Sequence, residues 1–463
     1  MKNSISIIGG GFAGTLLARQ IIERTNQYTI YLFNHTSELA KGVAYDCNQN
    51  TALLNVIASK MSAFPDDNEN FLNWCLNHPN YKNESKSIVG SAFLPRKIYG
   101  EYLKAIWNET LLKAKEKGIE IIVIYEKVIS IEKVENQFIV STNDQKIVSN
   151  ICVLATGNEE PGNPKNCPDS LLTDSNYFSN PWKIDFSKIN YSLPVLIIGN
   201  GLTMVDTVLS LREHHFSQKI ISISPNGFNI LPHRNFNLDF KSQLATIQTP
   251  ISLLELVHLF NQEVKTLRRF GVSPEPIIDA FRPNVAKVWQ QFSAEEKSKF
   301  MGRVRHIWGV ARHRIPFVSY DKIMKEQINQ QLEILAGKLV EIKQSSEGNK
   351  LTLWDKRLKK NKEFVVGSII NCTGPETKIT ATKNELLNQL FKDGIISQDS
   401  LNLGLRANTS SFRTINAKNQ ENECLFAIGS LLKGELWEST AVNELKNQAK
   451  ELAVLLTNEL PKT

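Results

Sequence analysis

The sequence predicts an α/β protein with two Rossmann-like dinucleotide-binding domains, each a three-layer unit of parallel sheet and β-meander, and with a helical insertion. Two glycine-rich turns between a strand and a helix support this prediction, as does a repeated order of strands that ends both times in Thr-Gly. The length of 463 residues leaves room for two or three domains. With 41% hydrophobic and 22% charged residues, the composition is that of a globular protein. The net charge of +7 does not by itself indicate a nucleic-acid partner.

The first glycine-rich turn follows directly on the first predicted strand. Residues 4–8 are apolar, and the sequence G-G-G-F-A-G at residues 9–14 leads into a helical stretch. In a G-x-G-x-x-G turn, Gly9 permits the bend, Gly11 lets the backbone approach a pyrophosphate, and Gly14 lets helix and strand pack closely. The N–H groups at the start of the helix then face the phosphates. This turn predicts a dinucleotide site.

The second turn has the same design, and each turn has one departure from the usual pattern. The strand 195–198 leads to Gly199 and Gly201, but the third glycine is replaced by Met204. The two glycines that face the phosphates remain, so we expect a second nucleotide there. In the first unit the acid that usually bonds the ribose is replaced by Asn34, whose amide can still bond a hydroxyl.

An internal repeat gives the domain organisation. Each half has a strand, hairpin strands and a last strand with a small residue before Thr-Gly, so that this last strand can return beside the nucleotide of its own turn. The two sets of segments are 119–131, 137–141 and 151–157, and 332–342, 350–354 and 369–374. A late strand to Gly429 and a helix from about Thr440 are expected to return to the first domain. We therefore predict a first dinucleotide-binding domain in residues 1–190 and 376–463, and a second in residues 191–375.

The insertion at about residues 231–330 is predicted to be largely helical. Apolar residues recur at helical spacing, and we interpret their stripe as core packing. The stripe consists of Leu253, Leu256, Val257, Phe260, Val264 and Leu267. Ser293 and Glu296 form a capping-box pattern for a further helix.

Several kinds of site and location are disfavoured. The six cysteines form no C-x-x-C pair, and the histidines match no metal-ligand spacing, so neither a redox dithiol nor a metal site is expected. The chain shows no leader pattern and no apolar run of membrane-spanning length. We expect a cytoplasmic protein without a membrane or metal partner.

Beyond the turns, several segments carry a resemblance to a known family. The chain resembles the flavoproteins with two dinucleotide-binding domains and, more narrowly, the FAD/NAD(P)-binding family, which includes bacterial flavin-dependent amino-acid N-monooxygenases. The resemblance covers nearly the whole chain. The segments that carry it are Gly42–Tyr45, Leu54–Asp67, Phe93–Leu103, Gly201–Asp206, Arg312–Arg314 and Trp437–Ala441.

The resemblance implies FAD in the first domain and NADPH or NADH in the second. For FAD it implies Gly9, Gly11, Phe12, Ala13 and Gly14 at the pyrophosphate, Asn34 at the ribose, Val128 from a strand over 125–131 at the adenine, Asn55 and Met61 near the flavin, Thr156 and Gly157 beside the nucleotide, Gly429 near the ribityl phosphate, and Ser439 and Thr440 at a helix start that faces the flavin. For NAD(P)H it implies Gly199, Gly201, Leu202 and Thr203 at the pyrophosphate, Thr373 and Gly374 opposite, and Ser224 near the adenosine ribose. No Arg follows Ser224, so Arg234 or the group around Arg312 is expected to replace the usual 2′-phosphate ligand.

The first functional hypothesis is a monooxygenase that hydroxylates a nitrogen of a small amino acid or amine through a flavin peroxide. The flavin performs the difficult step, so the protein mainly binds, orients and excludes water. Molecular oxygen and a small-molecule substrate are then the partners. Arg96 and Arg314 are candidates for holding a substrate carboxylate, and Asn55, Arg312 and His313 are the candidate catalytic residues.

Two other functional hypotheses are also compatible with the sequence. A flavin-dependent NAD(P)H reductase or oxidase without oxygen transfer would carry the same cofactor motifs. A non-catalytic nucleotide-binding or RNA-binding protein is the remote alternative, because residues 299–314 hold five Lys and Arg residues and no acid. No recognisable RNA module accompanies that stretch, so nucleic acid is not the expected partner. The sequence does not decide whether the protein forms a homo-oligomer.

Overall fold

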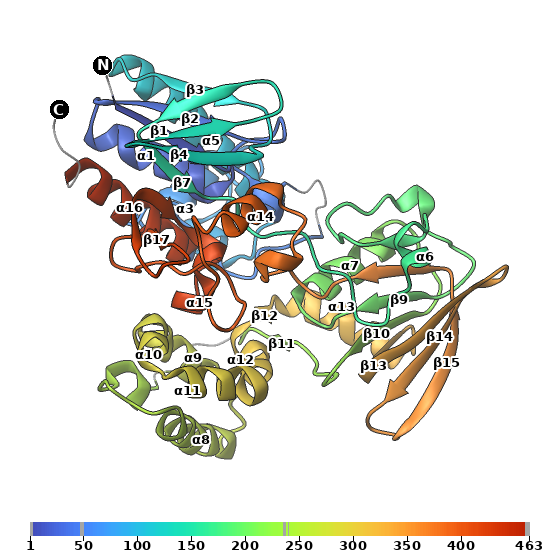
Figure 1. Cartoon of the computed structure of the whole chain (residues 1–463). Coiled ribbons are helices and arrows are strands. Elements are labelled where there is room, and N and C mark those ends of the chain that lie inside the picture. Colours follow the sequence, from blue (N-terminus) through green and yellow to red (C-terminus); the bar gives the residue numbers. More distant parts are fainter. Residues whose placement is uncertain (1–2, 47–50, 235–237, 239, 459–463) are drawn as a thin grey trace.

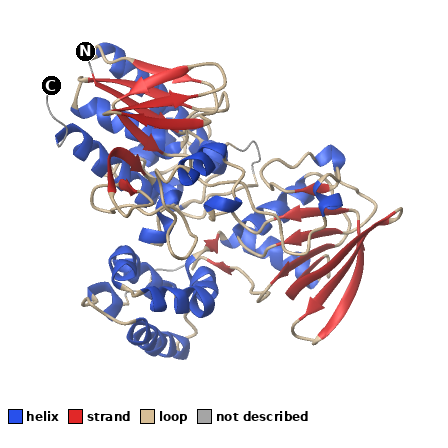
Figure 2. Cartoon of the chain, in the orientation of Figure 1, coloured by secondary structure: helices blue, strands red, loops and turns tan. Residues whose placement is uncertain are grey.

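The computed structural model describes residues 3–46, 51–234, 238 and 240–458. It shows a six-stranded sheet, a seven-stranded sheet and a lobe of helices (Figure 1). Helices and irregular segments separate the two sheets (Figure 2). Within the described residues, no helix is both long enough and apolar enough to cross a membrane.

The first sheet has the order β17-β18-β7-β1-β2-β3, and its strands are parallel except for β17. A separate three-stranded antiparallel sheet, β4-β5-β6, supplies the meander. Helix α1 packs between α5 and α16. The bounds are β1 Asn3–Ile8, α1 Phe12–Arg24, β2 Tyr28–Phe33, α5 Arg96–Glu116, β3 Ile121–Ile124, β4 Ser130–Val134, β5 Gln137–Ser141, β6 Lys146–Ser149, β7 Ile151–Leu154, β17 Arg413–Ile415, β18 Glu421–Ala427 and α16 Val442–Asn458.

The last segments of the chain complete this first sheet, as the sequence predicts. Strand β18 pairs in parallel with β7, with Leu425 opposite Cys152. Helix α16 buries Ala449, Leu452 and other apolar residues, and the Tyr28 hydroxyl donates to the carbonyl of Leu456 at 2.8 Å. Segments from both ends of the sequence therefore share one hydrophobic core.

The second sheet has the order β15-β14-β13-β10-β9-β16-β8. Its first element after the glycine turn is α7, and α13 packs against both α7 and β13. The bounds are β8 Tyr177–Phe178, β9 Val195–Ile198, α7 Leu202–Glu213, β10 Ile220–Ser224, α13 Phe317–Ile328, β13 Leu332–Ser345, β14 Gly348–Asp355, β15 Lys360–Val366 and β16 Ser368–Asn371.

Strand β13 belongs to both layers of the second unit. Its residues 332–336 pair in parallel with β10, and its residues 337–345 pair with β14 in the meander, with a register shift between Leu339 and Glu341. In the first unit the corresponding path is interrupted, because β3 ends at Ile124 and β4 begins at Ser130. The prediction of a strand over residues 125–131 is therefore wrong for residues 125–129, where the chain turns from the sheet into the separate meander.

The helical lobe (residues 240–312) has a hydrophobic core of its own, to which Leu403 also belongs and against which Trp437 packs. The predicted stripe lies on α8 and contributes to this core, so its interpretation as core packing is confirmed. Both residues of the predicted capping box, Ser293 and Glu296, cap α11. The lobe lies beside α15 of the first part of the structure (Figure 1). Its helices are α8 Leu253–Arg269, α9 Glu275–Phe281, α10 Val285–Gln291, α11 Ala294–Lys299, a π-helical turn Phe300–Val304 and α12 Arg305–Arg312.

Short elements connect these parts. The remaining helices and strands are α2 Gly42–Tyr45, α3 Asn70–Asn77, α4 Lys86–Ser91, α6 Asp169–Leu172, β11 Leu231–Pro232, β12 Arg314–Ile315, α14 Glu385–Lys392 and α15 Lys433–Leu436. Turns of 3₁₀ helix lie at Ala58–Lys60, Phe186–Lys188, Gln243–Thr246, Arg282–Asn284, Ile379–Ala381 and Gly429–Leu432.

Candidate functional site

The first glycine turn has the geometry that its sequence predicts. Gly9 has φ +120°, and a side chain there would collide with the carbonyl of Ala155. A side chain at Gly14 would collide with the carbonyl of Gly9. Both positions need glycine, and helix α1 starts directly after Gly11. The end of β7 therefore lies against the turn between β1 and α1.

The second glycine turn repeats this relationship. Gly199 has φ +115°, and a side chain there would collide with the carbonyl of Cys372, at the end of β16. Gly11 and Gly201, the residues before the two helices, share an extended conformation with ψ −165°. Met204 is buried in the core of the second unit, so the missing third glycine leaves the turn intact. The internal repeat predicted from the sequence is thus confirmed in its geometry.

Three buried hydroxyl groups follow β7 or lie between β18 and α16. The side-chain oxygens of Thr156, Ser430 and Ser439 are buried and have no hydrogen-bond partner among the described residues. A buried hydroxyl without a partner costs free energy, and a ligand with polar groups would satisfy it. Beside Thr156, a side chain at Gly157 would meet open space. These residues fit a polar cofactor such as FAD at the carboxyl ends of β1, β7 and β18.

Asn34 lies at this edge, but its amide has protein partners. Its side-chain oxygen accepts from the N–H of Gly10 at 3.3 Å, and its nitrogen donates to the carbonyls of Thr36 and Glu38 at 2.7 and 3.0 Å. Asn34 thus holds the glycine turn in place, and its ribose contact stays a prediction. Phe12 and Ala13 form the first turn of α1.

Four more residues are predicted to contact FAD. Val128 is buried in the connection before β4, and Met61 is buried after the 3₁₀ turn at 58–60. Gly429 has φ +83°, and its N–H donates to the side chain of Gln448 in α16. Thr440 is exposed just before α16 begins.

Two of the segments that carry the family resemblance, Leu54–Asp67 and Phe93–Leu103, contact each other beside Asn55. The N–H of Leu54 donates to the carbonyl of Leu94 at 2.8 Å, and Leu53 forms a bridge with Pro95. His233, which sequence reasoning missed, closes this loop pair: its Nε2 lies 2.9 Å from the carbonyl of Asn55, and its ring stacks on Phe93. The side chain of Asn55 is half-buried and has no hydrogen bond to the described residues.

Residues around the second turn also fit a nucleotide. Within the described part of the chain, the side-chain oxygen of Asn200 is buried without a partner, and added side chains at Gly201 and Gly374 would meet no atom within 4 Å. Leu202 and Thr203 form the first turn of α7. The Thr373 hydroxyl donates to Asn371, and the Ser224 hydroxyl accepts from the N–H of Gly227.

The three arginines predicted near the substrate already have carboxylate partners. Arg96 lies 3.3 Å from Asp206 and Arg312 lies 3.0 Å from Glu438. Arg314 is 3% exposed and lies 2.8 Å from Glu275. A substrate contact by any of these residues requires that its ion pair opens or is shared. The partners lie far along the chain, and spacing could not show them.

Three cationic or basic groups near Glu438 lack such a partner. Among the residues that the structure describes, Arg305 and Lys433 form no ion pair, and the ammonium of Lys433 lies 5.7 Å from the ring of Trp437. Burial, and then the charge of Arg305, lower the pKa of Lys433. Desolvation, and then the charges of Arg312 and Lys433, lower the pKa of His313 to about 4. We call Arg305, His313 and Lys433 the cationic cluster.

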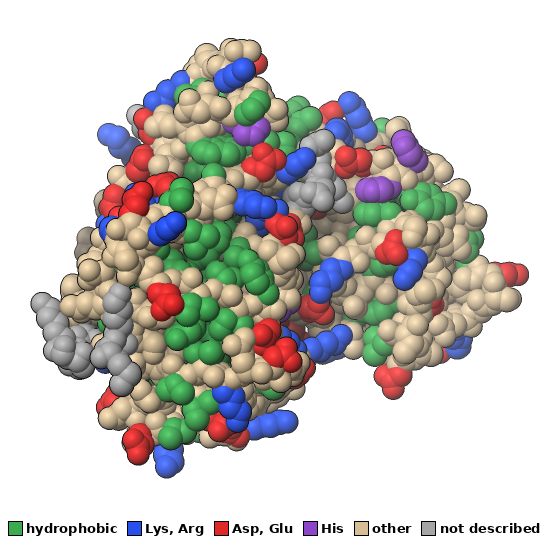
Figure 3. Space-filling view, turned by 90° about the horizontal axis from the view of Figure 1, so that it is seen from above, with side chains coloured by type: hydrophobic (Ala, Val, Ile, Leu, Met, Phe, Trp, Pro, Cys, Tyr) green, Lys and Arg blue, Asp and Glu red, His purple; other side chains and the backbone are tan. Residues whose placement is uncertain are grey.

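The described residues line two further cavities, one of which includes Thr203 in the first turn of α7. One of about 420 Å³ is lined by Ala52, Trp182, Thr203 and Asp206, where Arg96 also bonds Asp206. Burial raises the pKa of Asp206, and Arg96 opposes this shift. The view from above shows the surface hollowed between the two sheet-containing parts (Figure 3).

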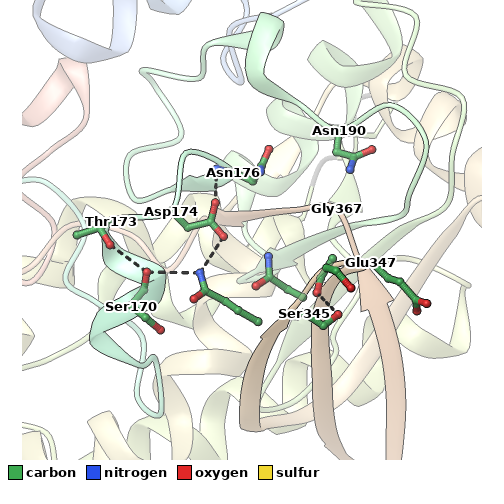
Figure 4. Close-up of a pocket in the computed structure, with 12 residues that line it drawn as sticks. Ser170, Thr173, Asp174, Asn176, Asn190, Ser345, Glu347 and Gly367 are labelled. Atoms are coloured by element: carbon green, nitrogen blue, oxygen red, sulfur yellow. Dashed lines mark hydrogen bonds between the residues drawn. The ribbon is translucent and has the colours of Figure 1, made fainter.

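The other cavity is polar and lies around Ser170, Asp174, Asn190 and Gly367 (Figure 4). Asn190 and Gly367 precede β9 and β16, so this cavity is at the amino ends of the parallel strands. Nucleotides bind at the carboxyl ends of such strands. It is therefore not the dinucleotide site.

The described part of the chain offers no group of three or more His, Cys, Asp or Glu residues that could hold a metal ion. Its five cysteines form no disulfide, and Cys47 lies outside the described residues. Burial raises the pKa of Cys75 and of Cys372 to about 12. Because the thiolate is the reactive form, these two thiols are unsuited to dithiol chemistry.

The two sheets and their glycine turns define a fold with two Rossmann-like dinucleotide-binding domains. Residues 6–159 match the family described as FAD-NAD(P)-binding, so the chain carries an FAD-NAD(P)-binding domain. No curated protein matches the sequence.

Solved structures share the fold along the whole chain. An ornithine N-hydroxylase from Kutzneria sp. 744, solved with reduced FAD, NADP+ and L-ornithine, has 13% identity and a TM-score of 0.66 and covers 98% of both chains. L-lysine 6-monooxygenase from Pseudomonas syringae has 12% identity and a TM-score of 0.68, with 100% of both chains covered. Bacillithiol disulfide reductase from Bacillus cereus has 12% identity and a TM-score of 0.55, and covers 99% of this chain and 100% of its own.

Proposed function

We propose that this protein is an FAD-dependent, NAD(P)H-consuming monooxygenase that hydroxylates a nitrogen of a small amino acid or amine. The observation that carries the proposal is the full-length likeness to ornithine and lysine hydroxylases, with TM-scores of 0.66 and 0.68 against 0.55 for the disulfide reductase. The high pKa of Cys75 and of Cys372 also disfavours a disulfide reductase. The site of action is the cytoplasm, where NAD(P)H is available.

The proposed assignment of cofactors follows the two glycine turns. Residues 1–190 and 376–463 hold FAD, and residues 191–375 hold NAD(P)H. When bound, FAD would supply the redox chemistry that links NAD(P)H to molecular oxygen. The N-terminus of α16 would stabilise negative charge on a flavin bound in front of it.

The protein then has to hold the substrate and keep its amine unprotonated. We assign the substrate carboxylate to Arg305 and Lys433, because these cations have no carboxylate partner among the described residues. Two cations that share a partly desolvated place repel each other, and an anionic ligand relieves that cost. His313, with a pKa of about 4, is neutral near pH 7 and can accept a hydrogen bond from the substrate.

The test is to purify the protein, record its flavin spectrum, and measure NADH and NADPH oxidation with a panel of amino acids and their decarboxylated amines. We expect one amino acid to accelerate coenzyme oxidation and to yield a hydroxylamine. Coenzyme oxidation that yields only hydrogen peroxide with every substrate would instead identify an oxidase. A colourless protein that does not take up FAD would overturn the proposal.

Substitution of Arg305 and Lys433 tests whether these two cations bind the substrate carboxylate. Lys433→Ala and Arg305→Ala should raise KM for the amino acid and leave KM for its decarboxylated amine unchanged. Lys299→Ala is the matched control, because Lys299 is exposed and pairs with Glu295 in its own helix. Equal effects on the amino acid and the amine would refute the carboxylate assignment.

A further inference from the structure

The turn between β14 and β15 lies beside the loop that follows β10. Ser224, the last residue of β10, is in register with Ala336 of β13. The N–H of Lys356 donates to the carbonyl of Ala336 at 2.7 Å, and the Arg357 guanidinium donates from Nη2 to the carbonyl of Gly227 at 3.1 Å. A turn that is distant in sequence therefore reaches the carboxyl edge of the parallel sheet.

The loop contacted by Arg357 is the expected position of the adenosine ribose. In Rossmann-type units the strand after the glycine-turn helix ends at that ribose, and a nearby Arg accommodates a 2′-phosphate. Here Gly199 of the glycine turn donates its N–H to Ile223 of β10 at 2.8 Å. Gly227 has φ +56°, and a side chain there would press on Ala336. The loop is thus packed closely between the glycine turn and β13.

The turn carries positive charge that the protein does not neutralise. Lys356, Arg357 and Lys359 are exposed, and none forms an ion pair within the described ranges. The carboxylate of Asp355, at the start of this turn, is paired with Lys362 and accepts the N–H groups of Arg357 and Leu358. The charge of Asp355 is therefore already balanced.

The arginines that the sequence offers for this role are occupied elsewhere. Arg234 bonds Glu275 at 2.8 Å, and Arg312 bonds Glu438 at 3.0 Å. Arg357 has instead one N–H fixed on the Gly227 carbonyl and the rest of its fork exposed. A guanidinium held in this way suits two-point binding of a phosphate.

We propose that Arg357, assisted by Lys356, forms a subsite for the 2′-phosphate of the adenosine ribose, so that the protein uses NADPH in preference to NADH. The inference rests on the assignment of NAD(P)H to the second glycine turn in the proposed function. It names the residue that discriminates between the two coenzymes. That residue lies in the turn between β14 and β15 and not in the segment that follows β10.

The test is calorimetric titration of the FAD-loaded protein with 2′,5′-ADP and with 5′-AMP, which differ in the 2′-phosphate. The wild type should bind 2′,5′-ADP more tightly. Arg357→Ala should weaken 2′,5′-ADP binding by about 10- to 100-fold, the range for a lost charge-assisted hydrogen bond, and leave 5′-AMP binding unchanged. Arg357→Lys, which keeps the charge and loses the fork, should lie between the two.

The matched control is Lys343→Ala, because Lys343 is an exposed cation at the other end of β13. It should bind both nucleotides as the wild type does. Equal affinity of the wild type for the two nucleotides, or equal weakening of both by Arg357→Ala, would overturn the proposal. Failure of amino-acid hydroxylation together with Arg357-dependent binding of 2′,5′-ADP would remove the proposed function and keep the subsite.

Discussion

The Nε2 atom of His233 lies 2.9 Å from the carbonyl oxygen of Asn55, and this contact joins the entrance of the helical insertion to the loop expected beside the flavin. The other ring nitrogen of His233 lies 3.1 Å from the carboxylate of Glu275 in α9. The buried ions of the insertion are thus connected through one imidazole to the backbone of the flavin-side loop.

Removal of this imidazole should loosen FAD without unfolding the protein. For His233→Ala we expect FAD dissociation to become about 5- to 10-fold more favourable, because the loop loses about one hydrogen bond. Flavin fluorescence after dilution measures the change. His258→Ala, an exposed histidine on α8, should retain FAD as the wild type does. Unchanged FAD affinity in His233→Ala would show that the contact does not position the loop.

Replacement of Glu275 should destabilise the fold. Glu275 is 6% exposed and lies 2.8 Å from both Arg234 and Arg314. Glu275→Gln removes the buried carboxylate that Arg234 and Arg314 share and should lower the free energy of unfolding by about 3–5 kcal/mol at pH 7. Glu295→Gln, at an exposed pair on α11, should change it by less than about 1 kcal/mol. Urea denaturation of the wild type and both variants measures these changes in the free energy of unfolding.

The difference in stability between the wild type and Glu275→Gln should depend on pH. Burial favours the neutral acid, but the hydrogen bond from His233 and the charges of Arg314 and Arg234 outweigh it and lower the pKa of Glu275 to about 2. A folded pKa below the ordinary value of 4.5 stabilises the protein above pH 4.5, and this stabilisation is lost as the pH falls toward 2. The stability difference between wild type and Glu275→Gln should therefore shrink over that window. A constant difference would contradict the assignment.

Substitution of Gly14 should prevent FAD binding. A methyl group there collides with the carbonyl of Gly9, so Gly14→Ala must separate α1 from the turn that faces the pyrophosphate. The purified variant should lack the flavin absorbance of the wild type. Gly302→Ala, where an added methyl group meets open space, should retain the yellow cofactor. Full flavin content in Gly14→Ala would show that the turn does not hold the pyrophosphate.

The imidazole of His313 should stay neutral over the physiological pH range. Desolvation and the neighbouring cations lower its pKa to about 4, from the model-peptide value of about 6.5. The unfolded chain therefore takes up a proton at higher pH than the folded chain, and this group makes folding less favourable as the pH falls from 6.5 to 4. An NMR titration should show no His313 transition between pH 6 and 8, and a midpoint there would contradict the assignment.

The turns and the repeat could be predicted because their residues are neighbours in sequence. Gly9 and Gly199 each follow an apolar strand directly, and the Thr-Gly pairs end strands of the same type. The partners of Arg96, Arg312 and Arg314 could not be predicted, because Asp206, Glu438 and Glu275 reach them only through tertiary packing. The same holds for Arg357, which meets Gly227 because β13 brings the meander to the sheet edge.

The pairing of β18 with β7 has a consequence for synthesis. While the ribosome makes the second sheet and the helical lobe, β7 presents an unpaired edge, since its neighbour β18 has not yet been translated. Exposed strand edges recruit other chains, and slow completion of a domain prolongs that exposure. The nascent protein is therefore vulnerable to aggregation until almost its whole length has emerged, and a fragment that stops before β18 should be insoluble.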